Sequence, residues 1–302
     1  MAETLMHPGE RVIDASLVRR LVATQFPQWA GLPVERVPSA GTVNAVYRLG
    51  DGMAVRLPRV EWGVGDVARE RRWLPFLAPR LPVEIPVVLG EGRPGEGYPW
   101  PWSVYRWLDG DTPETGGVPD LARFADPVRF ASDLAGFIGA LRRVETDGAP
   151  PAYRGGPLTE LDAAVRDALG RLGGIIDTGA AAAAWRAALK APEWSGPPVW
   201  VHSDLMPANL LVRDGRLSGV IDFATAGVGD PSCDLTVAWN LLPAKARQVF
   251  RAAVGADDAS WARGRGRALA IALVQLPYYR ETNPVLAANA RHTIEQVLAD
   301  RG

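Results

Sequence analysis

The spacing of apolar residues changes near residue 108, and this change limits the folds that the chain can adopt. Before it, short apolar runs bounded by Gly, Pro and Asp are typical of strands. The runs are residues 34–38, 45–49, 53–57, 85–89 and 102–107. Two segments in this part, 16–26 and 66–77, have helical spacing, and Asp66 is placed to cap the second. Asp51-Gly52, between two of the runs, predicts a β-hairpin.

Beyond residue 108 most segments have the period of a helix. They are residues 130–144, 158–172, 180–189, 235–242, 244–254, 262–276 and 285–298. The exception is a second predicted hairpin, 210–212 with 217–221, around Asp214-Gly215. We therefore expect an α+β protein of two lobes, a β-rich lobe at 1–107 and a mainly helical lobe at 108–302, with a hinge near 105–109.

The composition argues against several classes of function. A formal net charge of -1 gives no basic field that would attract nucleic acid or an anionic membrane. Cys233, the single cysteine, cannot form an intrachain disulfide or a thiolate metal cluster, and we expect it to pack as a small apolar group. No apolar run reaches the length of a membrane span, and residues 1–11 have no apolar signal segment. We expect a cytoplasmic protein without nucleic-acid or membrane partners.

Asp204, Asn209 and Asp222 form the pattern that carries chemistry. Asn209 follows Asp204 by five residues, and Asp222 comes at the end of the apolar strand that closes the second hairpin. Phosphoryl transfer asks a protein mainly for positioning and charge neutralisation: a carboxylate that orients the attacking hydroxyl and takes its proton, and oxygen ligands for magnesium. These three side chains supply that set. A turn cap at Asp204 and a loop-stabilising Asn209 would also explain the pattern.

The surrounding segments resemble a known family. His202-Ser203-Asp204-Leu205-Met206-Pro207-Ala208-Asn209 resembles the catalytic loop of the aminoglycoside phosphotransferase family, which has macrolide and choline kinases as relatives and shares the protein-kinase fold. Ile221-Asp222-Phe223 resembles the metal-binding strand of that family, and residues 229–235 resemble its Gly-Asp-Pro-x-x-Asp-Leu segment.

The resemblance implies a role for each matching position. Asp204 is then the catalytic base, Asn209 and Asp222 are magnesium ligands, and His202 is structural. Ser203 stands where the family usually has glycine, which implies that this loop position tolerates a Cβ atom.

The resemblance also places the nucleotide in the first lobe. Ser39, Gly41 and Thr42 lie in a loop that resembles the family's phosphate-side loop, where backbone amides and hydroxyls can face phosphate oxygens. An ordinary hairpin turn would look the same. The main chain near Arg106 and Leu108 falls where the family's hinge binds adenine.

A cation paired with an acid on the following helix is also expected in a kinase. Glu70 falls on the apolar stripe of the predicted helix 66–77, so it faces inward and needs a partner. Arg56 points away from the apolar side chains of its strand and stands where the family has lysine. Its fork can contact phosphate and carboxylate together. Arg59 and Arg69 are alternative cations, and an exposed surface arginine at position 56 would give the same pattern.

The acceptor site is the least readable part of the sequence. The resemblance places it between the catalytic loop and the last helices, where the candidates are Asn240, Tyr278, Tyr279, Arg280, Glu281 and Asn283. Acids and arginines are mixed there, which does not indicate a site for a polycation. The aromatic residues suit a larger apolar acceptor, although aromatic side chains also dominate ordinary cores.

We therefore expect a Mg²⁺-dependent O-phosphotransferase that moves the γ-phosphate of ATP or GTP to a hydroxyl of an aminoglycoside- or macrolide-type antibiotic, as a monomer or weak dimer. One alternative is a metabolic kinase of an amino alcohol or sugar. Another is a non-catalytic nucleotide-binding protein, suggested by Arg56 in place of lysine. Protein kinase activity is not expected, because no activation segment ending in Ala-Pro-Glu follows Asp222.

Overall fold

The structure, a computed structural model, describes residues 7–39 and 41–300. It divides into two compact units. The first comprises the described residues up to Pro79 together with Glu84–Asp109, and the second comprises Arg80–Val83 together with those from Gly110 onwards. The assignment of nucleotide binding to residues 1–107 and of catalysis to 108–302 stays a prediction.

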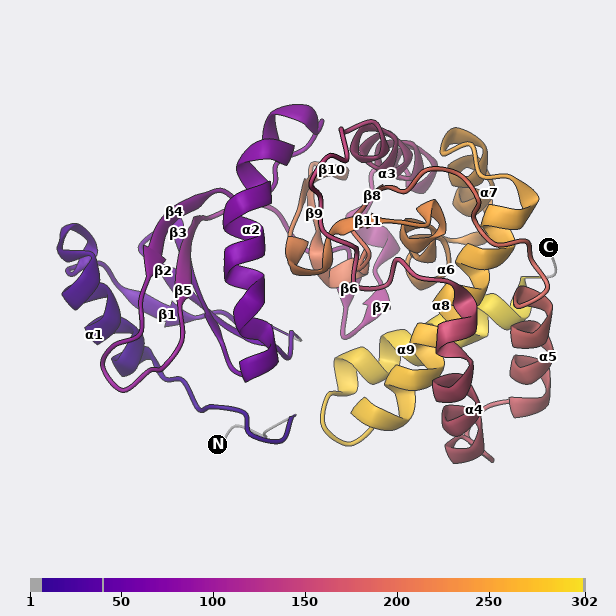
Figure 1. Cartoon of the computed structure of the whole chain (residues 1–302), viewed down its shortest axis with the longest axis horizontal. Helices are drawn as coiled ribbons and strands as arrows, with labels where there is room; N and C mark the ends of the chain where they lie inside the picture. Colours follow the sequence, from indigo (N-terminus) through magenta and orange to yellow (C-terminus); the bar gives the residue numbers. More distant parts are fainter. Residues whose placement is uncertain (1–6, 40, 301–302) are drawn as a thin grey trace. The chain divides into compact units, whose positions relative to one another are not determined.

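The first unit is a five-stranded antiparallel sheet with a helix on each face (Figure 1). The strand order is β1-β2-β3-β5-β4. Its elements are α1 (Ala15–Gln25), η1 (Pro27–Trp29), β1 (Val34–Arg36), β2 (Asn44–Leu49), β3 (Met53–Pro58), η2 (Glu61–Gly63), α2 (Val64–Leu77), η3 (Ala78–Arg80), β4 (Val88–Gly92) and β5 (Trp102–Arg106). The expected hairpin joins β2 and β3, with Leu49 opposite Met53. Its left-handed residue is Gly50 (φ +57°), a conformation that costs glycine little.

Successive side chains of each strand point to opposite faces of the sheet, so one face is apolar and the other is not. Val55 and Leu57 of β3 are fully buried and belong to one apolar cluster with Leu21 of α1 and Trp102 of β5. Each such side chain contributes roughly 1.5–3 kcal/mol on burial. Arg56, between them in sequence, points to the opposite face and contacts α2. The sheet therefore has an apolar side under α1 and a charged position under α2.

Two expectations for this unit are wrong. The predicted strand 85–89 is displaced to β4 at Val88–Gly92, because Pro86 has no amide hydrogen for a sheet ladder. Gly92 then lies against Trp102, where an added Cβ atom would be 1.9 Å from the indole ring. Asp66 does not cap α2: this helix begins at Val64 after a 3-10 turn, and Asp66 lies in its first turn, where a carboxylate favours the helix dipole.

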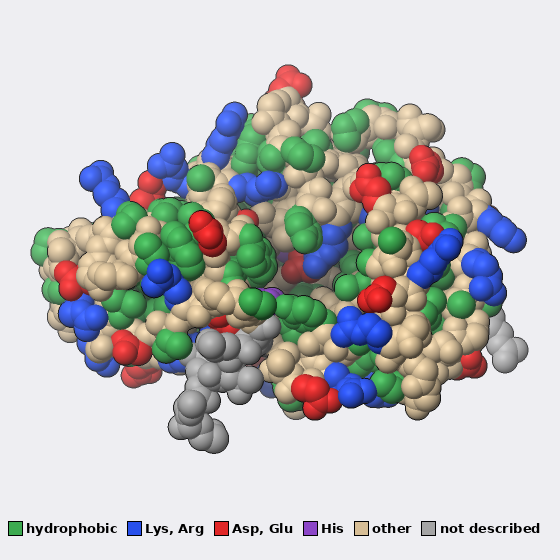
Figure 2. Space-filling view, turned by 60° about the horizontal axis from the view of Figure 1, so that its bottom comes forward, with side chains coloured by type: hydrophobic (Ala, Val, Ile, Leu, Met, Phe, Trp, Pro, Cys, Tyr) green, Lys and Arg blue, Asp and Glu red, His purple; other side chains and the backbone are tan. Residues whose placement is uncertain are grey.

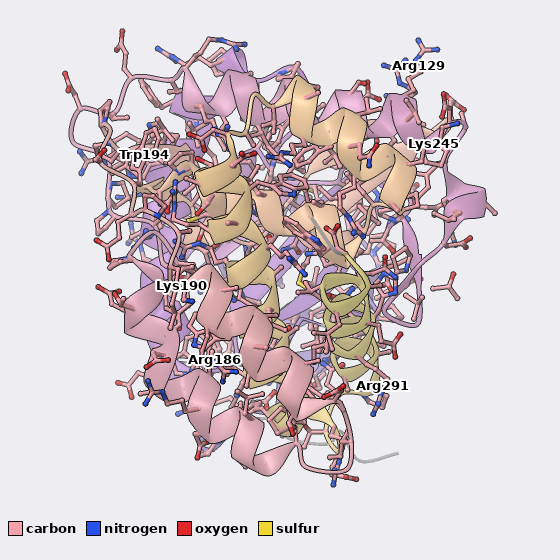
Figure 3. All side chains as sticks on the ribbon, turned by 90° about the vertical axis from the view of Figure 1, so that its right-hand side faces the viewer. Arg129, Arg186, Lys190, Trp194, Lys245 and Arg291 are labelled. Carbon is pink, nitrogen blue, oxygen red and sulfur yellow. The ribbon has the colours of Figure 1, made fainter. Side chains whose placement is uncertain are left out.

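The second unit is mainly helical. Its elements are β6 (Glu114–Thr115), β7 (Val118–Pro119), η4 (Leu121–Arg123), α3 (Pro127–Arg142), η5 (Leu158–Leu161), α4 (Asp162–Arg171), α5 (Thr178–Ala188), β8 (Val199–Val201), η6 (Pro207–Asn209), β9 (Leu210–Arg213), β10 (Arg216–Val220), η7 (Phe223–Thr225), β11 (Gly227–Gly229), η8 (Pro231–Thr236), α6 (Val237–Asn240), α7 (Ala244–Ala253), α8 (Asp258–Tyr279) and α9 (Pro284–Ala299). Figure 3 views this unit from the side of α4 and α5, and the cations that it labels come from separate helices or lie next to them.

The helix α8 lies at the centre of this unit. Asp257 caps it by accepting a hydrogen bond from the Ser260 amide at 2.7 Å. Two glycines on α8 allow close approach of its neighbours. A Cβ atom at Gly264 would lie 2.6 Å from the Leu235 Cβ of η8, and one at Gly266 would lie 2.4 Å from the Ala188 Cβ of α5. These glycines thus permit close packing of α8 against η8 and against α5.

The expected hairpin of β9 and β10 is confirmed, with Arg213 opposite Arg216. Two helical segments are divided where one continuous helix was expected. Residues 158–172 form η5 and α4, and residues 235–242 are shared by the 3-10 turn η8 and the short helix α6. The early start of η8 follows from Asp230, which caps the Ser232 amide, and from Pro231 at the first helical position.

Charges of both signs are scattered over the face drawn in Figure 2, as the near-zero formal charge requires. Among residues 7–39 and 41–300, no helix is both long and apolar enough to cross a membrane. Cys233 is buried, and burial raises the pKa of its thiol to about 12. The expectation that it packs among apolar groups is confirmed, and its Sγ in addition donates a hydrogen bond to the Arg154 carbonyl.

Candidate active site

The loop of residues 202–209 follows β8, and the Asp234 side chain accepts hydrogen bonds from its first two residues. This carboxylate accepts hydrogen bonds from the amides of His202 and Ser203 at 2.9 and 2.8 Å. Asp234 is fully buried, and burial raises its pKa above the usual range. Two backbone donors converging on one buried carboxylate fix the start of the loop.

His202 is a packing residue of this loop. Its ring is fully buried, lies edge-on to Phe223 with ring centroids 4.7 Å apart, and has Nε2 at 3.0 Å from the Ile221 carbonyl oxygen. The loop is thereby tied to the segment that carries Asp222. The structural role expected for His202 agrees with this geometry.

Asp204 lies within reach of two donors from different parts of the unit. Arg154 Nη1 donates to Asp204 Oδ1 at 2.6 Å, and Asn209 Nδ2 donates to the Asp204 carbonyl at 2.9 Å and to its Oδ2 at 3.2 Å. The Asp204 side chain keeps 23% of its surface exposed. Burial alone would lower the pKa of the Arg154 guanidinium, but the Asp204 carboxylate outweighs it and raises that pKa. Asp204 is therefore an oriented, accessible carboxylate.

Asn209 and Asp222 are joined through the backbone. The Ile221 amide donates to the Asn209 carbonyl at 2.9 Å, so the residue before Asp222 is bonded to the end of the loop. Asp222 has a left-handed backbone (φ 64°, ψ 66°), which is uncommon outside glycine and is often retained at functional sites. Asn209 Oδ1 accepts no hydrogen bond from the described residues. Carboxylate and amide oxygens of this kind are suitable ligands for magnesium.

Ser203 also has a left-handed backbone, with φ +71°. The sequence indicated only that this position tolerates a Cβ atom. The structure adds that the side chain is used, because Ser203 Oγ accepts a hydrogen bond from the Arg154 amide at 3.0 Å.

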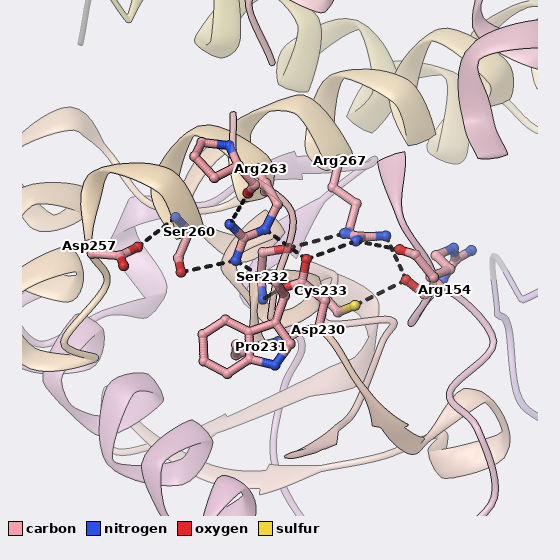
Figure 4. Close-up of polar contacts among 12 residues, drawn as sticks. Arg154, Asp230, Pro231, Ser232, Cys233, Asp257, Ser260, Arg263 and Arg267 are labelled. Carbon is pink, nitrogen blue, oxygen red and sulfur yellow. Dashed lines mark hydrogen bonds and ion pairs between the residues drawn. The ribbon is translucent and has the colours of Figure 1, made fainter. Parts of the chain in front are cut away.

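Figure 4 shows a buried network of ion pairs and hydrogen bonds around Asp230. Asp230 pairs with Arg263 at 2.8 Å and with Arg267 at 3.4 Å. Burial would raise the pKa of Asp230, but the Arg263 hydrogen bond, the Ser232 amide and the two guanidinium charges together lower it. Arg267 also donates to the Arg154 carbonyl at 2.6 Å, so the network reaches the residue that contacts Asp204.

In the first unit, the expected pair of Arg56 and Glu70 is formed. Arg56 Nη1 donates to Glu70 Oε1 and Oε2 at 2.8 and 3.0 Å. With the Asn44 amide turned so that its oxygen faces the guanidinium, Asn44 Oδ1 accepts from Arg56 Nε and Nη2 at 3.0 and 2.8 Å. Tyr105 donates to Glu70 Oε2 at 2.5 Å, and burial followed by the Glu70 charge raises the pKa of this phenol well above its usual value. Arg59, the alternative cation, is buried against Glu10 at 2.5 Å.

The remaining nucleotide-side positions lie in loops of the same unit, except Arg106, which ends β5. Ser39 Oγ accepts from the Gly41 amide at 3.0 Å, and Thr42 is buried. At the expected hinge, the Arg106 amide donates to the Val87 carbonyl at 2.8 Å and is therefore already used. The Leu108 amide has no hydrogen-bond partner among the described residues.

Sequence comparison agrees with this geometry. The model of the phosphotransferase enzyme family, APH, matches residues 34–269. The chain belongs to this phosphotransferase family. None of the curated protein sequences is a significant match to it.

Solved structures of phosphotransferases have a similar fold. The complex of APH(2'')-IIIa with GDP and kanamycin is 21% identical, with a TM-score of 0.76 and coverage of 94% of this chain and 99% of that chain. Macrolide 2'-phosphotransferase MphH from Brachybacterium faecium is 24% identical, with a TM-score of 0.61 and coverage of 96% and 99%. The gentamicin complex of APH(2'')-IIa is 17% identical, with a TM-score of 0.64 and coverage of 96% and 98%. The expected two-lobed, protein-kinase-like α+β fold is confirmed.

Among the acceptor candidates, Asn240 makes a side-chain hydrogen bond to the loop of residues 202–209. Its Nδ2 donates to the Leu205 carbonyl at 2.9 Å, and its buried Oδ1 has no partner among the described residues. Tyr278 and Tyr279 stack edge-on at the end of α8, 4.8 Å apart. Glu281 is exposed and pairs with Arg280 at 2.9 Å.

Arg154 was missed by the sequence analysis. It lies 50 residues before Asp204 in a Gly- and Pro-containing turn, and its contact with Asp204 depends on the fold of the whole unit. A pocket of about 250 Å³ in the same unit includes Gly155, Trp194 and Arg263 in its lining and none of the positions predicted to bind nucleotide, magnesium or acceptor.

Proposed function

We propose that the chain transfers the γ-phosphate of ATP or GTP to a hydroxyl group of an aminoglycoside- or macrolide-type antibiotic. The observation that carries the proposal is the placement of Asp204: a partly exposed carboxylate whose two oxygens are held by separate donors, on a loop fixed by the buried Asp234. Membership of a phosphotransferase family supports the reaction class.

In this mechanism Asp204 orients the acceptor hydroxyl and receives its proton as the oxygen attacks phosphorus. Oδ1 is engaged by a charged donor at 2.6 Å, whereas Oδ2 has only the amide contact at 3.2 Å. Oδ2 is therefore the better acceptor for the hydroxyl proton. Positioning of this kind matters more than covalent participation in phosphoryl transfer.

Asn209 and Asp222 would hold magnesium. The fit rests on the uncommitted Asn209 Oδ1 and on the chemistry of an amide oxygen with a carboxylate. When bound, the metal would neutralise phosphate charge during the transfer. The strained backbone of Asp222 is consistent with a side chain that must point in one required direction.

Arg56 would neutralise phosphate charge in the first unit, with Glu70 holding its guanidinium. Its side chain is 15% exposed, and its three nitrogens already contact Glu70 and Asn44, so its charge rather than a free N–H would act on the phosphate. Ser39, Gly41 and Thr42 would face the phosphates, and the Leu108 amide, with no partner among the described residues, would donate to the purine at the hinge. Arg106 would contribute main-chain carbonyl rather than amide contacts, because its amide is used by Val87.

The choice of an antibiotic as acceptor draws on the similar structures. One contains GDP with kanamycin, another gentamicin, another streptomycin with ATP, and others are macrolide 2'-phosphotransferases. Asn240, whose buried Oδ1 has no hydrogen-bond partner among residues 7–39 and 41–300, is the first candidate to contact the acceptor. Tyr278, Tyr279 and Glu281 would form a more distant part of that site. A metabolic kinase of an amino alcohol or sugar would use the same Asp204, Asn209 and Asp222.

The test is release of nucleoside diphosphate with magnesium, with ATP or GTP as donor. The acceptor panel contains kanamycin, gentamicin, streptomycin, a macrolide, choline and small sugars, with Asp204→Ala as the inactive control. Release that depends on one antibiotic class supports the proposal. Release only with choline or a sugar would assign the metabolic alternative, and nucleotide binding without release from any acceptor would indicate the non-catalytic alternative.

A further inference from the structure

Arg154 contacts the catalytic loop at three points. Its backbone amide donates to Ser203 Oγ at 3.0 Å, and its Nη1 donates to the Ser203 carbonyl at 2.9 Å and to Asp204 Oδ1 at 2.6 Å. Both side-chain contacts come from one nitrogen. The side chain is 23% exposed, the same fraction as that of Asp204, so the ion pair borders solvent.

The segment that carries Arg154 lies beside β11 as an added strand. Pro151 forms a parallel bridge with Val228, the Ala152 amide donates to the Val228 carbonyl at 3.0 Å, and the Val228 amide donates to the Pro150 carbonyl at 2.8 Å. Glycines make this approach possible. A Cβ atom at Gly227 would lie 2.5 Å from the Pro150 oxygen, and one at Gly229 would lie 2.6 Å from the Gly155 Cα.

The Arg154 carbonyl is fixed by two buried groups (Figure 4). Arg267 Nη1 donates to it at 2.6 Å and Cys233 Sγ at 3.0 Å. Arg267 is itself 1% exposed and is bonded to the Gly156 carbonyl and to Asp230. The backbone of Arg154 is thus held at both its amide and its carbonyl, which restricts where its guanidinium can lie.

We propose that Arg154 is a positioning residue for the base Asp204, an inference that rests on the phosphotransfer function proposed above. Arg154 engages Oδ1 and fixes the plane of the carboxylate, while Asn209 contacts Oδ2 from the other side. The acceptor hydroxyl is thereby directed to Oδ2. An orientation error of about 1 Å can lower turnover about 10²-fold. We therefore expect this contact to affect the rate of turnover as well as the stability of the fold.

The nature of the contact sets the expected order of variants. Because one nitrogen makes both side-chain bonds, a lysine ammonium can replace it with a slightly shorter reach. Methionine at this position keeps much of the length and loses the charge. The chain also offers a matched control, Arg216, which donates to Asp133 through two bonds of 2.6 Å at the surface of the same unit.

The experiment compares the full-length wild type with Arg154→Lys, Arg154→Met and Arg216→Met. Initial rates are measured with magnesium and GTP or ATP, with kanamycin as acceptor and with water alone, and the Tm of each variant is recorded. We expect kcat of Arg154→Met to fall about 10²-fold with the KM for nucleotide within twofold of wild type. Arg154→Lys should recover most of kcat, and Arg216→Met should keep it.

Two results would overturn the inference: kcat of Arg154→Met within twofold of wild type, or Arg154→Lys as slow as Arg154→Met. If Arg154→Met also lowers Tm, crystal structures decide: a reoriented Asp204 carboxylate supports the inference, and an unmoved one refutes it. Asp204→Ala separates this test from the proposed function. Turnover that requires Asp204 upholds the function whatever Arg154→Met does. A wild type that is inactive with every antibiotic of the acceptor panel removes the function, while the crystal structures still decide the orientation.

Discussion

Arg56 and Glu70 are joined by a single nitrogen, Nη1, which donates to both carboxylate oxygens at 2.8 and 3.0 Å. The other two nitrogens of the guanidinium are directed at the Asn44 side-chain oxygen. The Glu70 side chain is 1% exposed, so these donors and the Tyr105 hydroxyl supply the hydrogen bonds that a buried carboxylate needs. All three guanidinium nitrogens of Arg56 therefore have partners, Glu70 on α2 and Asn44 on β2.

Arg56→Lys should be harmful, although lysine is the residue usual in the family. A lysine ammonium can keep the Glu70 contact but cannot also fill the fork that faces Asn44, which leaves the half-buried Asn44 side-chain oxygen without these donors. We expect a loss of about 1 kcal/mol in the free energy of unfolding and a higher KM for nucleotide. Urea denaturation and initial rates measure both. Asn44→Ala serves as the control, because it removes the same contact without changing the cation, and a more active Arg56→Lys would contradict this reading.

Asp204→Asn should remove turnover and leave the fold intact. The amide keeps the size of the carboxylate but cannot take the acceptor proton, and general base catalysis contributes about 10²–10⁴-fold. The side chain is partly exposed, so its replacement should change Tm little. Nucleotide affinity, measured by calorimetry, should stay within twofold of wild type. Asp167→Ala, at an exposed carboxylate on α4 that pairs with Arg171, is the matched control. Unchanged kcat in Asp204→Asn would remove the mechanism.

The sequence predicts those parts of the fold that depend on local signals. The hairpin at residues 210–220 and the inward position of Glu70 follow from turn chemistry and periodicity, and both are observed. The displaced β4 depends on Pro86 and on the close approach of Gly92 to Trp102, a contact between strands that periodicity does not contain. The 3-10 start of η8 depends likewise on the buried acid Asp230.

The same division holds for the candidate site. Asp204, Asn209 and Asp222 lie close in sequence and in a recognisable spacing, so they could be proposed without a structure. Arg154 could not, because its approach to Asp204 follows from the pairing of its segment with β11 and from the buried Arg267. Contacts between segments 50 residues apart leave no local pattern in one sequence.

Ser203 should be more tolerant of glycine than of alanine. Its left-handed backbone costs a non-glycine residue about 1 kcal/mol or more, and its hydroxyl recovers about 1 kcal/mol through the Arg154 amide. Ser203→Gly removes both effects and should change the free energy of unfolding by less than about 1 kcal/mol. Ser203→Ala keeps the strain and loses the bond, so it should be less stable than Ser203→Gly by about 1 kcal/mol. Urea denaturation of the two variants gives this order directly, and an alanine variant as stable as the glycine one would show that the backbone is not strained.

Cys233 should make the protein lose stability in alkaline solution. Burial raises the pKa of its thiol to about 12 from an ordinary value of 9.0, so the thiol ionises first in the unfolded chain. The contribution of this thiol to the free energy of unfolding is complete below pH 9.0 and is lost as the pH rises towards about 12. In that window the free energy of unfolding should fall by up to about 1.4 kcal/mol per pH unit from this group alone.

Cys233→Ala, compared with wild type by urea denaturation under reducing conditions at pH 8 to about 10.5, should reduce the slope of the free energy of unfolding against pH, whatever its absolute stability. Tyr98 and Tyr105, whose pKa values burial also raises, leave a residual slope in both proteins. Equal slopes in the two proteins would mean that the thiol reaches water in the folded state.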